Sequence, residues 1–177
     1  IIGNFSNMGS VGLYSIGYNF GSIMSMIVSA INFAYIPFFM STAKDKGEEA
    51  NGIFAKIATY YMAAILLFAL IISIFSKEVI MIMTTEPYYE AYKVVPFIAF
   101  AFVLNGMYYF VVNPIFYVKS AIKYLPMATF SAAGANLFFN FILIPKYGYM
   151  GAAYSSILSF SISLVLTWLI SHKFYPI

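Results

Sequence analysis

Long apolar stretches constrain this chain more than any other feature of its sequence. Five of them follow one another, separated by short polar segments, at about residues 11–40, 53–75, 94–118, 124–145 and 149–170. Each holds at least about 20 residues, enough for a helix rising ~1.5 Å per residue to cross ~30 Å of hydrocarbon. None shows the period-two alternation of a membrane β-strand. The sequence therefore predicts an all-α integral membrane protein, with five transmembrane helices in one helical region, 1–177.

The composition excludes several classes of soluble protein. Hydrophobic residues make up 63% of the chain and charged residues only 8%, against roughly 25% charged in an ordinary soluble domain. So few charges cannot cover a water-exposed surface, so we do not expect an enzyme or any catalytic residue. The net charge of +3, without Arg, gives no support for nucleic-acid binding. With no Cys and a single His, we expect no metal site and no cofactor.

The distribution of Lys predicts the orientation in the membrane. Five helices alternate sides, so their connections fall into two sets. One set holds six Lys, namely Lys44, Lys46, Lys56, Lys119, Lys123 and Lys173, and the other holds three, namely Lys77, Lys93 and Lys146. Because Lys accumulates in cytoplasmic loops, we expect the first set to be cytoplasmic. The amino end would then lie outside and the carboxyl end inside.

A polar stripe runs along the first predicted helix. Its members recur at spacings of four and three residues and are Tyr18, Ser22, Ser25, Ser29 and Asn32. This spacing places them on one face of a helix, and a polar group in lipid needs a partner. Two interpretations remain open. The stripe either packs against other helices, helped by Gly17 and Gly21, or it lines a transport cavity.

Similar faces are predicted on three other helices. They comprise Asn105, Tyr109 and Asn113 on the third, Thr129, Ala133, Asn136 and Asn140 on the fourth, and Ala152, Ser156, Ser159 and Ser163 on the fifth. Packing alone would also select such faces. No Asp, Glu or Arg lies deep in a predicted span, which argues against a proton relay in this part of the chain. Lys119 and Lys123 flank a short connection, where they either anchor the helices or attract an anionic lipid-linked headgroup.

A longer motif spans the end of the fourth predicted helix and the start of the fifth. Residues 135–153 combine Asn136 and Asn140, four apart, with Pro145, a pair of glycines and two alanines. This pattern resembles the bacterial polysaccharide-biosynthesis flippases of the multidrug/oligosaccharidyl-lipid/polysaccharide exporter superfamily. Segments 11–18, 29–39 and 91–96 are similar to other parts of the same proteins, so the resemblance covers essentially the whole chain.

The resemblance implies a MATE-like transporter of about 12 to 14 helices in two lobes, in the bacterial plasma (inner) membrane. This chain would form most of the carboxyl-terminal lobe. We expect a piece of a longer protein, since the sequence opens at Ile1 without an initiator Met, and the missing amino-terminal lobe would be its partner. The implied activity is to flip an undecaprenyl-diphosphate-linked oligosaccharide from the cytoplasmic to the outer leaflet for polysaccharide or O-antigen synthesis.

Candidate transport-pathway residues are the polar ones within the spans: Ser25, Ser29, Asn32, Asn105, Asn136 and Asn140. Members of the superfamily place cationic residues in the cavity, and this chain has no Arg, which leaves charge recognition to the missing lobe or to Lys near the helix ends. The main alternative is a cation-coupled multidrug exporter of the same superfamily, which would require an intramembrane acid. A membrane glycosyltransferase would need charged extramembrane loops, which are short here, and a structural subunit also stays open.

Overall fold

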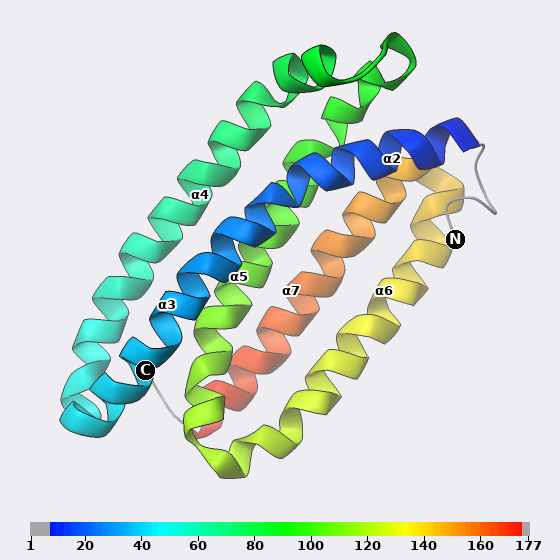
Figure 1. Ribbon diagram of the computed structural model, residues 1–177. Helices are drawn as coiled ribbons and strands as arrows, with labels where there is room; N and C mark the ends of the chain where they lie inside the picture. Colours follow the sequence, from blue (N-terminus) through cyan, green and yellow to red (C-terminus); the bar gives the residue numbers. More distant parts are fainter. Residues whose placement is uncertain (1–7, 175–177) are drawn as a thin grey trace.

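The computed structural model describes residues 8–174, which fold into six α-helices joined by short 3-10 segments (Figure 1). In chain order these are α2 (Met8–Gly21), α3 (Ile23–Lys46), η1 (Gly47–Glu49), α4 (Ala50–Met83), η2 (Glu86–Lys93), α5 (Val95–Tyr117), η3 (Lys119–Tyr124), α6 (Leu125–Tyr147) and α7 (Tyr149–Phe174). The described residues contain no strand, which confirms the all-α prediction. Ile1, on which the expectation of a longer protein rests, lies outside them.

The helices have the length and composition of membrane spans. Four helical segments are long and apolar enough to cross a bilayer: Met8–Met83, Val95–Tyr117, Ser120–Tyr147 and Tyr149–Phe174. The first contains α3 and α4, which run antiparallel and meet at the η1 turn (Figure 1). The chain is therefore an all-α protein of the multi-pass membrane class.

Helix α4 is longer than the sequence predicted. It continues to Met83, so the predicted end at residue 75 is wrong, because Ser, Lys and Glu at 76–78 do not break a helix. The 20 residues between Lys56 and Lys77 measure ~30 Å, the thickness of the hydrocarbon layer. We therefore place the two membrane boundaries of α4 at these lysines.

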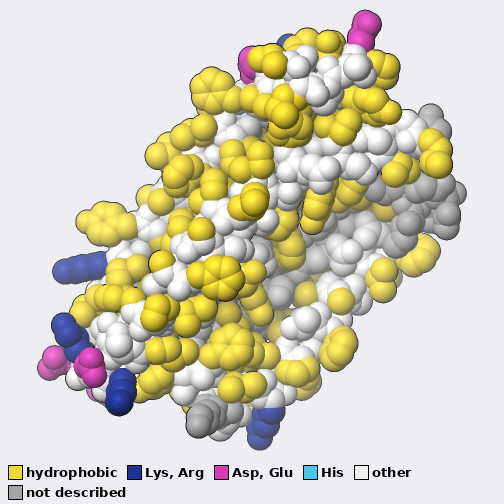
Figure 2. All heavy atoms as spheres, in the orientation of Figure 1, with side chains coloured by type: hydrophobic (Ala, Val, Ile, Leu, Met, Phe, Trp, Pro, Cys, Tyr) yellow, Lys and Arg dark blue, Asp and Glu magenta, His cyan; other side chains and the backbone are white. Residues whose placement is uncertain are grey.

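Charged side chains lie at the two ends of the molecule, and apolar side chains cover the middle (Figure 2). The α3–α4 turn, η3 and the carboxyl-terminal end of α7 share one end, while η2 and the α6–α7 turn share the other (Figure 1). The six-Lys and three-Lys sets therefore lie at opposite ends, as predicted. Which end is cytoplasmic stays a prediction.

The first apolar stretch forms two helices, so the prediction of one helix over 11–40 is wrong. The break falls at Ser22, and α2 runs at an angle to α3 (Figure 1). The Ser22 hydroxyl donates to Asn19 O at 2.8 Å, and the Ser25 hydroxyl donates to Ser22 O at 2.7 Å. Such side-chain bonds to the backbone, next to Gly21, bend a helix.

The glycines of α2 provide close packing, as the sequence predicted. A Cβ placed on Gly17 would lie 2.6 Å from Val94 Cβ, and one on Gly21 would lie 2.6 Å from Ile98 Cβ. Only a residue without a side chain fits at these two positions. Helix α2 is thereby held against the start of α5.

Helix α7 packs between α5 and α6 through small residues at its amino end. Gly151, Ala152 and Ala153 are buried there, and a Cβ on Gly151 would collide with the Leu143 backbone of α6. Gly148 makes the turn with a φ of +59°, a conformation that favours glycine. Helices α6 and α7 therefore form a tight antiparallel hairpin.

Candidate functional site

A cavity of about 760 Å³ lies among α2, α5, α6 and α7. Its walls come from four separate helices, brought together because α7 separates α5 from α6 while α2 crosses near them. The residues that line it are Tyr14, Tyr18, Asn105, Tyr108, Thr129, Ala132, Ala133, Asn136, Leu137, Ser156, Ser159, Phe160 and Ser163.

The lining is polar but uncharged. None of the described lining residues is Asp, Glu, Lys, Arg or His, whereas seven carry a hydroxyl and two carry an amide. The hydroxyls of Thr129, Ser156 and Ser159 donate to backbone carbonyls of their own helices, so they offer the cavity acceptor lone pairs. This chemistry suits a neutral ligand rich in hydroxyl groups rather than a charged one.

A chain of hydrogen bonds fixes the polar wall formed by α6 and α7. The Asn140 amide donates to Asn136 Oδ1 at 2.9 Å, and the Asn136 amide donates to the Ser159 hydroxyl at 3.0 Å. Ser159 in turn donates to the Ser155 carbonyl oxygen. Because both Asn136 donor and acceptor atoms have partners, its side chain is held in one orientation at the cavity wall.

Aromatic rings form the side of the cavity next to α2. The rings of Tyr14 and Tyr18 lie 5.8 Å apart, and the ring of Tyr18 meets that of Phe102 edge-on at 6.1 Å. Phe102 also contacts Phe160 of α7, at 5.9 Å between ring centroids. This wall adds apolar ring faces beside the hydroxyls of α7.

The structure brings only part of the predicted pathway set together. Asn105 and Asn136 line the cavity, and Asn140 joins it through its bond to Asn136. Ser25 bonds to the backbone at the break between α2 and α3, and neither it nor Ser29 lines the cavity. The predicted stripe is split because its members lie on two helices rather than one.

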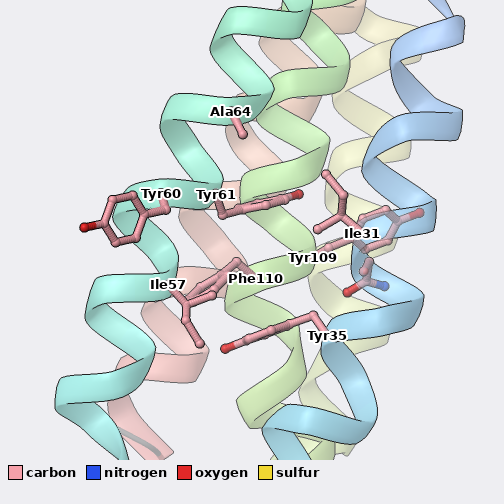
Figure 3. Close-up of a pocket in the computed structure, with 9 residues that line it drawn as sticks. Ile31, Tyr35, Ile57, Tyr60, Tyr61, Ala64, Tyr109 and Phe110 are labelled. Atoms are coloured by element: carbon pink, nitrogen blue, oxygen red, sulfur yellow. The ribbon is translucent and has the colours of Figure 1, made fainter.

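Asn32 contributes to a second, smaller cavity. This cavity of about 330 Å³ lies between α3, α4 and α5 and is lined mainly by apolar and aromatic side chains (Figure 3). Asn113 donates a hydrogen bond of 3.0 Å to Asn32 Oδ1. Asn105 lines the larger cavity, whereas Asn113 bonds to a residue that lines the smaller one. The two residues are eight apart on α5, a rotation of about 80° beyond two full turns.

Several lining residues were not among the predicted pathway residues. Tyr108 lines the cavity from α5 beside Asn105. Ser156, Ser159 and Ser163 were identified as a polar face of the fifth predicted helix without a pathway role. Their spacing was a signal that they share one face of the helix. The missing information was which helix that face contacts.

The two lysines proposed to attract an anionic headgroup belong to η3, between α5 and α6, and the side chain of Lys119 lies outside the part of the chain that the structure describes. The Lys123 ammonium lies 5.2 Å from the centroid of the Tyr124 ring, a cation–π distance. At the opposite end, Lys93 pairs with Glu90, and this hydrogen bond raises the pKa of Lys93. The Lys123 ammonium, at the six-Lys end, therefore contacts an aromatic ring, whereas the Lys93 ammonium contacts a carboxylate.

Comparison with known proteins does not extend the assignment beyond the fold class. No protein-family model, curated protein or solved structure matches the chain. The function is therefore argued from the cavity and from the residues that carry the resemblance given above.

Proposed function

We propose that this chain is most of the carboxyl-terminal lobe of a flippase that moves a lipid-linked oligosaccharide across the bacterial inner membrane. The observation that carries the proposal is the uncharged cavity lined by hydroxyls and amides within otherwise apolar helices. Polar groups inside a membrane are costly and are retained where they serve a pathway or a partner. Asn136 and Asn140, which belong to the flippase-like motif at 135–153, lie at the wall of this cavity.

The proposal takes α3 to α7 as five membrane spans. Met8–Met83 includes the two antiparallel helices α3 and α4, which count as separate spans. An odd number of spans places the two ends of the chain on opposite sides. The end with six lysines is cytoplasmic under the positive-inside rule.

The cavity chemistry supports sugar as the group that it holds. An oligosaccharide presents hydroxyls that would donate to the serine oxygens of α7 and would both donate to and accept from the Asn105 amide. The diphosphate needs cationic partners, and the described cavity lining supplies none. Lys119 and Lys123 in η3, or the amino-terminal lobe, would bind the diphosphate.

The absence of charge in the described lining also favours the flippase over a cation-coupled drug exporter. Such an exporter requires an acid that binds the coupling ion within the membrane. None of the six acidic residues of the chain lies within the proposed spans. Four are in η1 and η2, Asp45 is at the end of α3 next to η1, and Glu78 follows the Lys77 boundary of α4. An exporter would have to supply that acid from another part of the protein.

The test is transport by the full-length protein reconstituted in proteoliposomes with a fluorescent lipid-linked oligosaccharide. Asn136→Leu removes both hydrogen bonds at the cavity wall and should lower the flipping rate at least tenfold. Phe138→Leu, on the exposed face of the same helix, is the matched control and should flip at the wild-type rate. Equal rates for wild type and Asn136→Leu would reject the cavity as the pathway.

A further inference from the structure

The smaller cavity lies where the α3–α4 packing is interrupted. Near the η1 turn the two helices meet through Phe39 and Phe54, whose ring centroids are 4.5 Å apart. Further along, a separate core that includes Val28 and Ile65 joins them again with α5. Between these two buried clusters the helices leave the 330 Å³ cavity, a volume at the small end of ligand pockets.

Aromatic rings make the inner wall of this cavity. Tyr35 of α3 stacks on Phe110 of α5 at 4.9 Å, and Tyr61 of α4 stacks on the same ring at 6.0 Å (Figure 3). The Tyr60 side chain points away from the bundle and is 76% exposed, so it forms the outer edge. The wall is therefore apolar and the cavity opens towards the surrounding lipid.

A lysine lies one helical turn from Tyr60, the outer edge of this cavity. Lys56 immediately precedes the lining residue Ile57 and lies one turn before Tyr60, on the same face of α4. None of the described acidic side chains forms an ion pair with Lys56. Its charge is thus unpaired within the described chain, at the boundary that we assign to the hydrocarbon layer.

The cavity extends from Lys56 towards the middle of the membrane. Its deepest α4 residue, Ala64, is eight residues further along the helix, ~12 Å deeper at 1.5 Å per residue. A phospholipid has the same layout, with a charged group at the interface and an acyl chain directed inward. A cationic side chain at the interface beside an inter-helix pocket is typical of anionic-lipid recognition.

We propose that α3, α4 and α5 form a binding site for one anionic phospholipid, with its phosphate at Lys56 and an acyl chain in the aromatic cavity. This site is separate from the polar cavity, because α5 presents Tyr109 and Phe110 to the one and Asn105 and Tyr108 to the other. The two cavities therefore share no lining residue.

The test is native mass spectrometry of the full-length protein in detergent, titrated with phosphatidylglycerol or phosphatidylcholine. The wild type should retain phosphatidylglycerol more tightly. Lys56→Gln should weaken phosphatidylglycerol about fivefold, the factor expected for one lysine near an anionic surface, and leave phosphatidylcholine unchanged. Lys77→Gln, at the far boundary of α4, is the charge control and should retain the preference.

The acyl-chain part of the site is tested by filling the cavity. Ala64→Phe should weaken both lipids, whereas Ala63→Phe, on the neighbouring exposed position, should weaken neither. Ile57→Trp fills the cavity from the other side and is used if Ala64→Phe fails to fold. Equal affinity of the wild type for the two lipids, or wild-type affinity in both filled variants, would overturn the proposal.

Discussion

Asn113 of α5 donates a 3.0 Å hydrogen bond to Asn32 of α3, joining residues 81 positions apart in the chain. Asn113 is almost fully buried, and its partner lies at the wall of the aromatic cavity. Both residues had been identified from sequence as polar positions inside apolar helices. Their pairing explains how two amides are tolerated in the bundle, because each satisfies the other away from water.

The Asn32–Asn113 bond should contribute modestly to stability. Hydrogen bonds between membrane helices average about 0.6 kcal/mol, so a double-mutant cycle of Asn32→Ala and Asn113→Ala should give a coupling free energy of about that size. The measurement is equilibrium unfolding of the full-length protein in mixed detergent. A coupling free energy of zero would mean that the two amides do not interact.

Asn140→Leu should reduce transport less than Asn136→Leu does. Asn136 lines the cavity and bonds to Ser159, whereas Asn140 only supports Asn136. Each substitution should lower the unfolding free energy by only about 1 kcal/mol. Flipping rates and thermal midpoints are measured on the same preparations. A fall in midpoint that matches the loss of transport in both variants would make the pair a packing device.

Two glycines should respond oppositely to substitution by alanine. A Cβ on Gly151 collides with the Leu143 backbone, so Gly151→Ala should destabilise by about 1–3 kcal/mol through overpacking. Gly134 on α6 has nothing within 4 Å of its would-be Cβ. Gly134→Ala should therefore stabilise by up to about 1 kcal/mol, the difference in helix propensity. Thermal unfolding in detergent compares them, and equal midpoints would contradict the α6–α7 packing.

The orientation is tested with single cysteines, because the natural chain has none. Ser41→Cys and Ser120→Cys lie at the six-Lys end, and Thr85→Cys lies at the other. In intact cells, a membrane-impermeant thiol reagent should label Thr85→Cys and spare the other two. Labelling of Ser41→Cys and Ser120→Cys with protection of Thr85→Cys would invert the topology.

Apolar length was enough to predict the helices, because a chain in lipid must satisfy its backbone hydrogen bonds within each segment. It was not enough to place their breaks. The apolar stretch runs unbroken through Gly21 and Ser22, so the bend there depends on hydroxyl bonds to the backbone that no hydropathy pattern shows. The end of α4 was placed too early because Lys77 marks a membrane boundary rather than a helix end.

The candidate site was predictable as a list of polar residues but not as an arrangement. Asn136 and Asn105 were identified, and they do share a cavity. Asn32 was grouped with them but lies at a different one, since its neighbours are set by the packing of α3 against α4 and α5. Faces can be read from spacing, whereas the partner of each face is decided by tertiary contacts.

The most direct test of the proposed pathway is the reactivity of a cysteine at Ser156, which lines the polar cavity. In the reconstituted full-length protein, Ser156→Cys should react with a water-soluble thiol reagent, and lipid-linked oligosaccharide should slow that reaction. Ser161→Cys, the same substitution on the opposite face of α7, is the control and should stay unreactive. An unreactive Ser156→Cys, or a reaction rate that the oligosaccharide does not change, would contradict a water-filled path that holds the sugar.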